Sequence, residues 1–133
     1  YGNAPDGWKH PRAEVVTPEN DAQLADFYRS IDILLAPGTV QHGAPHYPVL
    51  EAMACGTPVV TTGYLPANAE NAWITENRNS ASIADAVNDI RTLSPEKLRL
   101  KLDKAFEAAS EFQWSRIAPK FLDAFSRAIK QQR

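Results

Sequence analysis

Residues 48–60, PVLEAMACGTPVV, have the pattern of a short helix that runs directly into a strand. Pro48 suits the first turn of a helix, where its missing N–H group is not needed. Gly56 suits the position after the last helical turn, because glycine adopts a positive φ without strain. The β-branched run at 58–62 then predicts a buried strand.

The segments upstream and downstream extend this pattern. Residues 31–36, IDILLA, are almost continuously apolar and stop at Pro37, which predicts a buried strand of a parallel sheet. A helix is expected over 18–30, begun either at Thr17 and Pro18 or at Asn20 with Gln23 three residues on. Residues 13–16 and 72–75 are two further strand candidates. Strands alternating with helices through short connections predict an α/β fold with a parallel sheet, whose ligands bind at the carboxyl ends of the strands.

The last third of the chain is expected to be helical. Ser80 or Ser82 should cap one helix, and Ser94 should cap a second. A final helix carries an apolar stripe and should hold Pro119 in its first turn or bend there. We expect this stripe to pack mostly on the local core and to leave some apolar surface exposed; its residues are Trp114, Ile117, Phe121, Phe125 and Ile129.

Composition bounds the class of protein. The chain has 133 residues, about the size of one ordinary domain, with 44% hydrophobic and 23% charged residues. A net charge of −2 gives no basis for nucleic-acid binding. A single cysteine, Cys55, excludes an internal disulfide and is expected to be a buried small apolar residue. No apolar run approaches the roughly 20 residues of a membrane span, and a cytoplasmic location is the default expectation.

The loop at 38–46 leads into a helix N-terminus near Tyr47, where backbone N–H groups and the helix dipole favour an anion such as a diphosphate. Gly43 and Ala44 are small enough for a ligand to approach the backbone. Glu51, about one turn inside the helix, could accept hydrogen bonds from ribose hydroxyls, or it could be an ordinary surface acid. The residues alone predict a possible nucleotide site.

Several residues in or near this loop have two possible interpretations each. His46 either contacts a phosphate or sugar or is an ordinary loop histidine, and His42 is a weaker candidate. Gly63 either lets a phosphate approach or only forms a turn. Thr39, in the same loop, is a further candidate binding residue. The histidines at 10, 42 and 46 lack helical metal-ligand spacing, so we expect no metal site.

Residues 49–60 resemble the nucleotide-binding domain of GT-B-fold retaining glycosyltransferases, the glycosyl transferases group 1 family, whose pattern reads P-x-L-E-A-M-A-C-G-x-P-V-V. Residues 23–37 and 71–74 resemble the family's preceding helix and strand and its following strand, and residues 112–114 resemble the entry to its last helix. The resemblance implies a Rossmann-like parallel sheet with flanking helices, part of a GT-B architecture, that binds the nucleotide of a sugar donor. It implies no bound metal and no cofactor, and a nucleotide diphosphate sugar as the substrate.

In that family the second acid of an E-x₇-E pattern binds the donor ribose, and it corresponds to Glu51. The first acid contacts the donor sugar and would fall at Gly43, so the resemblance implies that sugar recognition differs here or is lost. A looser resemblance to rhamnosyltransferases that use dTDP-rhamnose suggests a deoxyhexose donor. The resemblance leaves the catalytic residues unassigned.

The family also carries an Arg and a Lys near the start of this domain, and an acceptor-binding domain before it. We therefore expect residues 1–133 to be one domain, the distal part of the nucleotide-sugar-binding domain, and expect the isolated chain to be inactive. A saccharide acceptor, for example a growing surface polysaccharide, would reach it through the missing N-terminal domain. The alternative function is a non-catalytic nucleotide-sugar-binding or docking module. An incomplete sheet would also expose an edge strand through which chains could associate.

Overall fold

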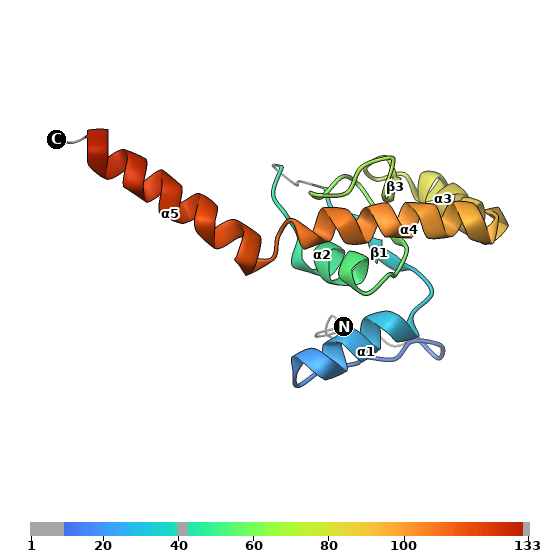
Figure 1. Cartoon of the computed structure of the whole chain (residues 1–133). Helices are drawn as coiled ribbons and strands as arrows, with labels where there is room; N and C mark the ends of the chain where they lie inside the picture. The colour runs from blue at the N-terminus through green and yellow to red at the C-terminus, as the bar shows by residue number, and fades with distance from the viewer. Residues whose placement is uncertain (1–9, 40–42, 132–133) are drawn as a thin grey trace.

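A three-stranded parallel sheet lies at the centre of the chain (Figure 1). The computed structural model describes residues 10–39 and 43–131. The strands β1 (Leu34–Ala36), β2 (Val59–Thr61) and β3 (Trp73–Ile74) pair in the order β1-β2-β3. Leu34 lies opposite Val59, and Val60 opposite Trp73. The α/β fold with a parallel sheet is confirmed.

Helices cover both faces of this sheet. In the described residues the helices are α1 (Asp21–Ser30), α2 (Tyr47–Ala54), α3 (Ser80–Thr92), α4 (Pro95–Ser110) and α5 (Trp114–Gln131). Val59 packs in one core cluster with Met53 of α2 and Ala105 of α4. The next residue, Val60, packs in a second cluster with Ile90 of α3. Successive strand residues point to opposite faces, which places α2 and α4 on one side of the sheet and α3 on the other.

The structure distinguishes between the two predicted starts of α1. The Asn20 side chain accepts a hydrogen bond from the Gln23 N–H at 3.0 Å, and Gln23 Oε1 accepts from the Glu19 N–H at 2.8 Å. This reciprocal arrangement resembles a capping box and starts the helix at Asp21. The start at Thr17 and Pro18 was wrong, because residues 17–20 are not helical and the Asn20 side chain makes the capping bond.

Two other local predictions were wrong. Residues 13–16 form no strand; Val15 is exposed, and these residues pair with none of β1, β2 and β3. Asn79, rather than Ser80 or Ser82, caps α3, because its side chain accepts from the Ser82 N–H at 3.1 Å. The Ser94 cap of α4 is confirmed.

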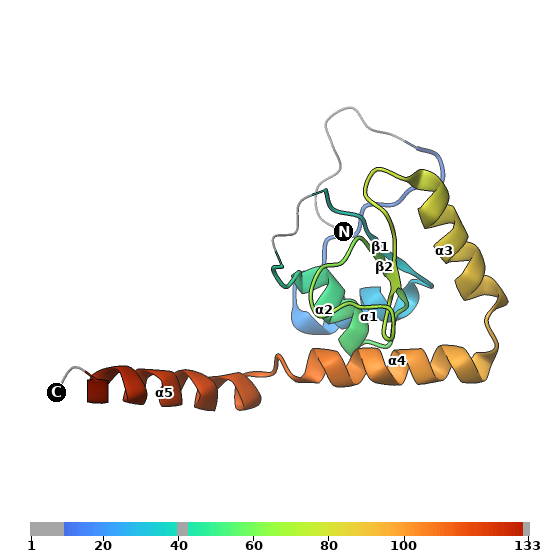
Figure 2. The same cartoon turned by 90° about the horizontal axis from the view of Figure 1, so that it is seen from above.

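The last helix, α5, differs most from expectation. It extends away from the sheet and the other helices (Figures 1 and 2), and none of its residues is buried. The prediction that its apolar stripe packs mostly on the local core was wrong. Pro119 lies inside the helix, beyond its first turn. None of the helices in the described part of the chain is both long and apolar enough to cross a membrane.

Candidate functional site

The N-terminus of α2 begins beside the carboxyl edge of the sheet. His46 is its N-cap residue and accepts backbone hydrogen bonds from Val49 and Leu50, but its side chain makes no capping bond. Its ring instead stacks on Tyr64, with ring centroids 4.3 Å apart and planes 17° from parallel. His46 Nδ1 is buried, and no described residue hydrogen-bonds to it. The imidazole is therefore held by aromatic packing, with one ring nitrogen without a protein partner in the described part of the chain.

Tyr64 joins this histidine to the ends of two strands. Its ring lies over Gly38, in the loop after β1. Thr62 Oγ1 accepts from the Gly38 N–H at 2.9 Å and donates to the Gly38 carbonyl at 2.7 Å. The loops that follow β1 and β2 are thereby fixed to each other. Tyr64 thus contacts both Gly38 and His46.

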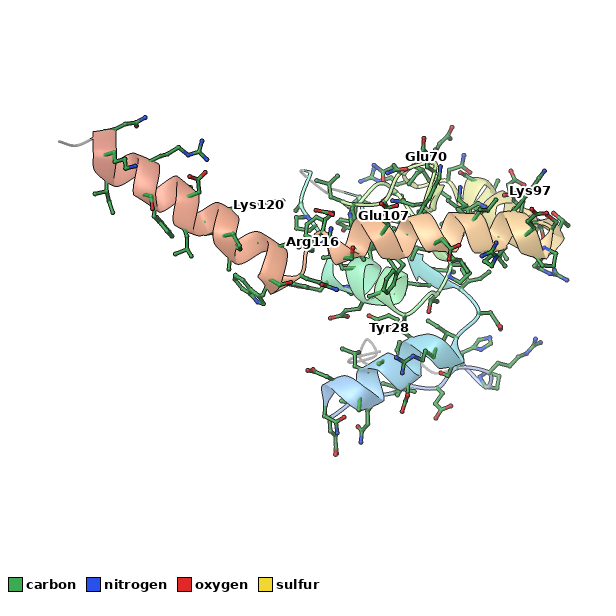
Figure 3. The ribbon with its side chains drawn as sticks, viewed as in Figure 1. Tyr28, Glu70, Lys97, Glu107, Arg116 and Lys120 are labelled. Carbon is green, nitrogen blue, oxygen red and sulfur yellow. The ribbon has the colours of Figure 1, made fainter. Side chains whose placement is uncertain are left out.

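Glu51 points from α2 toward α1. Its Oε2 accepts a hydrogen bond of 2.8 Å from the hydroxyl of Tyr28, which is fully buried between these helices (Figure 3). Thr57 Oγ1, just after α2, donates to the Tyr28 backbone carbonyl at 2.7 Å. Two contacts therefore tie Tyr28 to α2 and to the turn after it, and the Glu51 carboxylate is held at one point rather than free in solvent.

A cavity of about 240 Å³ opens beside this carboxylate, between α1 and α2. Two acids, Asp21 and Glu51, line it together with four other residues, Leu24, Ala25, Tyr28 and Cys55. Burial raises the pKa of the Cys55 thiol, the nearby Glu51 carboxylate adds to the increase, and Arg29 opposes it. The cavity combines an apolar wall with two hydrogen-bond acceptors, as a nucleoside site requires.

The small residues of the loop stay near the start of α2. Gly43 has φ +67° and is exposed, and Ala44 accepts a backbone hydrogen bond from Leu65 at 3.3 Å. Tyr47 is 78% exposed. Gly63 has φ +107°, a conformation that favours glycine whether or not a ligand approaches. His42 lies outside the described residues.

Thr39 lines a different cavity, of about 360 Å³, at the carboxyl ends of β1 and β2. Arg78 and Glu76 line the same cavity, and the Thr39 carbonyl accepts from Asn77 at 3.4 Å. The predicted residues therefore divide into three places: Glu51 between α1 and α2, His46 and Tyr47 at the start of α2, and Thr39 on the α3 side.

The sequence interpretation missed the wall that α1 contributes to the Glu51 cavity. Asp21, Leu24, Ala25 and Tyr28 recur at helical spacing and so share one face of α1. That spacing was visible, but nothing in it indicates that the face turns toward Glu51. In the part of the chain that the structure describes, no group of three His, Cys, Asp or Glu side chains is placed to hold a metal ion.

The sequence also matches a described family over this region. The family model described as "Glycosyl transferases group 1" matches residues 6–92, which contain α1, the sheet, α2 and the Glu51 cavity. The chain belongs to the glycosyl transferases group 1 family. This confirms the resemblance first seen in residues 49–60.

Curated relatives agree with the family. "D-inositol 3-phosphate glycosyltransferase 2" of Catenulispora acidiphila is 32% identical over 123 residues, covering 89% of this chain and 28% of the relative. "D-inositol 3-phosphate glycosyltransferase" of Mycolicibacterium smegmatis is 27% identical over 127 residues, covering 92% and 28%. The chain thus spans little more than a quarter of the length of these relatives.

Proposed function

We propose that the chain is the donor-nucleotide-binding part of a glycosyltransferase, and that the cavity between α1 and α2 receives the nucleoside. The observation that carries this is the position of Glu51, whose carboxylate lines the cavity while its helix begins at the carboxyl edge of the sheet. A carboxylate accepts hydrogen bonds from ribose hydroxyls, and Leu24 and Ala25 offer an apolar surface for a flat base.

The donor diphosphate would lie at the start of α2. The helix dipole favours negative charge there, and the neighbouring loop offers the small residues Gly43 and Ala44. His46 Nδ1, without a described protein partner, and the exposed Tyr47 are polar groups beside this position. Gly63 and Thr39, after β2 and β1, complete the proposed donor-binding set.

The proposed reaction moves a sugar from a nucleotide diphosphate sugar to an acceptor. Developing charge on the leaving diphosphate would be stabilised by preorganised donors and the helix dipole, without a bound metal. Position 43 carries no acid to contact the sugar, so other groups must recognise it, and a deoxyhexose remains the proposed donor sugar. The same observation favours the second candidate function, a module that binds nucleotide sugars without catalysis.

The rest of the enzyme would be needed for transfer. We propose that residues 1–133 form the distal part of the donor domain, in a cytoplasmic protein, and that the isolated chain is inactive. The exposed apolar side of α5 and the edge of β1, where Leu35 is 51% exposed, are surfaces that other parts of the protein or another chain would cover.

The names of the relatives guide the choice of acceptor. The relatives are named for D-inositol 3-phosphate, and nothing in their names supports a surface polysaccharide. We propose a small phosphorylated polyol as the first acceptor to assay with the complete enzyme.

Calorimetric titration with UDP, dTDP and GDP tests nucleotide binding. The proposal predicts that one of them binds and that Glu51→Ala weakens its affinity by about tenfold or more, because a hydrogen bond to a charged group is lost. Gly56→Asn, at an exposed turn with positive φ, is a control that leaves the cavity unchanged. Absence of binding to the folded chain, or equal binding by Glu51→Ala, would contradict the proposal.

A further inference from the structure

We propose that Tyr28 is a positioning residue that orients the Glu51 carboxylate, and that this pair makes the cavity select nucleotides whose sugar is ribose over those with 2′-deoxyribose. This rests on the proposed function, since it assigns Glu51 to the nucleotide sugar. The observation behind it is the 2.8 Å hydrogen bond from the Tyr28 hydroxyl to Glu51 Oε2, inside the lining of the cavity.

Tyr28 is rigidly held. It is fully buried in the core cluster, and its ring meets Phe27 edge to face with centroids 5.3 Å apart. The Thr57 hydroxyl donates to its backbone carbonyl. Because both the ring and the backbone of Tyr28 are held in place, its hydroxyl can hold the Glu51 carboxylate in one orientation.

Glu51 needs such a constraint to discriminate between sugars. A glutamate side chain on a helix surface has several rotatable bonds, and ordering it costs conformational entropy whenever a ligand binds. The bond from Tyr28 removes part of that freedom before the nucleotide arrives. Because Tyr28 is a neutral donor, it leaves the negative charge of Glu51 in place, and carboxylate oxygens accept more than one hydrogen bond each.

A purely structural role is the competing explanation. A buried hydroxyl needs a partner, and Glu51 could serve only to satisfy Tyr28 and join α1 to α2. The two roles differ in one measurable quantity. Only the positioning role makes the ratio of ribonucleotide to deoxyribonucleotide affinity depend on the Tyr28 hydroxyl, because lost stability alone weakens both affinities equally.

The test uses whichever of UDP and GDP binds more tightly, and measures by calorimetry its affinity and that of its 2′-deoxy analogue, which differ by one hydroxyl. The unsubstituted chain should prefer the ribonucleotide by about tenfold, the effect of one hydrogen bond to a charged group. Glu51→Ala should remove the preference. Tyr28→Phe, which keeps the ring and removes only the hydroxyl, should reduce it to about threefold or less. Ser94→Ala, which loses the α4 cap far from the cavity, should lower stability and keep the full preference.

The outcomes separate the two proposals. If Tyr28→Phe keeps the full preference while Glu51→Ala loses it, Tyr28 is only structural and this inference is overturned, whereas the proposed function stands. If the unsubstituted chain has no preference, or Glu51→Ala retains it, Glu51 does not bind the nucleotide sugar and both are overturned. Should Tyr28→Phe fail to fold, Thr57→Val loosens the Tyr28 backbone instead, and a preference equal to that of Ser94→Ala overturns the inference.

Discussion

The ring of Tyr64 lies so close over Gly38 that a Cβ at position 38 would fall 2.2 Å from the Tyr64 hydroxyl oxygen and 2.6 Å from its Cζ. The same ring stacks on His46, the cap of α2. The Tyr64 ring therefore links position 38, in the loop after β1, to the start of α2.

Gly38→Ala should destabilise the chain by about 1–3 kcal/mol, the usual cost of forcing an extra carbon into a packed site. The ring of Tyr64 cannot yield without leaving His46, so the loss should exceed that of an ordinary surface substitution. Urea denaturation followed by the tryptophan fluorescence of the chain measures it.

The control for this prediction is a double-mutant cycle. In a Tyr64→Ala background the added methyl has no ring to meet, so Gly38→Ala should cost less than about 0.5 kcal/mol. An equal cost in both backgrounds would show that the strain at position 38 comes from somewhere other than Tyr64.

Asn20→Ala should cost about 1 kcal/mol, because the Gln23 N–H loses its acceptor at the start of α1. Since Asp21 and Leu24 of this helix line the Glu51 cavity, nucleotide affinity should fall as well. Ser94→Ala removes the equivalent cap of α4, and it should lose similar stability without the loss of affinity. Thermal unfolding and titration of both variants distinguish a local from a general effect.

Cys55 should react slowly with iodoacetamide near neutral pH. Burial raises the pKa of its thiol, so at a given pH less thiolate is present than for a free cysteine, and the labelling rate should rise at higher pH than for glutathione. Glu51→Gln removes the carboxylate that adds to the increase and should shift the profile toward lower pH without abolishing the effect of burial. A profile identical to that of glutathione would show that the thiol is not shielded.

Phe121→Ser combined with Phe125→Ser should leave the unfolding free energy of the rest of the chain within about 0.5 kcal/mol of its original value, because α5 contributes no buried residue. The same variant should lose any self-association measured by analytical ultracentrifugation, since its apolar face is reduced. Charged side chains including Arg116 and Lys120 remain on α5 and preserve solubility (Figure 3). A cooperative loss of stability would mean that α5 packs on the domain after all.

Short stretches of sequence correctly predicted strands and helices where the residue types favour the element that they form. The apolar run before Pro37 and the valines at 59 and 60 form parallel strands, and Pro48 lies in the first turn of α2. The strand at 13–16 failed because alternation and β-propensity do not supply a neighbour with which to pair. The apolar stripe of α5 was also visible in the sequence. Such a stripe indicates that one face of the helix favours burial, but it does not indicate which part of a protein buries it.

The candidate site was predictable only in part. Glu51 and the start of α2 follow from one continuous segment, so sequence spacing places them together. The contribution of α1 depends on how two helices meet across the fold, and Tyr28 reaches Glu51 from 23 residues away in the chain. Thr39 lines a separate cavity with Glu76 and Arg78, and its spacing from Glu51 in the sequence does not indicate this separation.

Protection of Cys55 from alkylation tests the central claim most directly, because this only cysteine of the chain lines the same cavity as Glu51. The rate is measured at about pH 8.5, where a thiol is partly ionised, with and without a saturating nucleoside diphosphate. We predict a rate at least fivefold lower with the nucleotide, and no protection in Glu51→Ala at the same concentration. An unchanged rate with a nucleotide that calorimetry shows to be bound would place the nucleotide elsewhere and contradict the account.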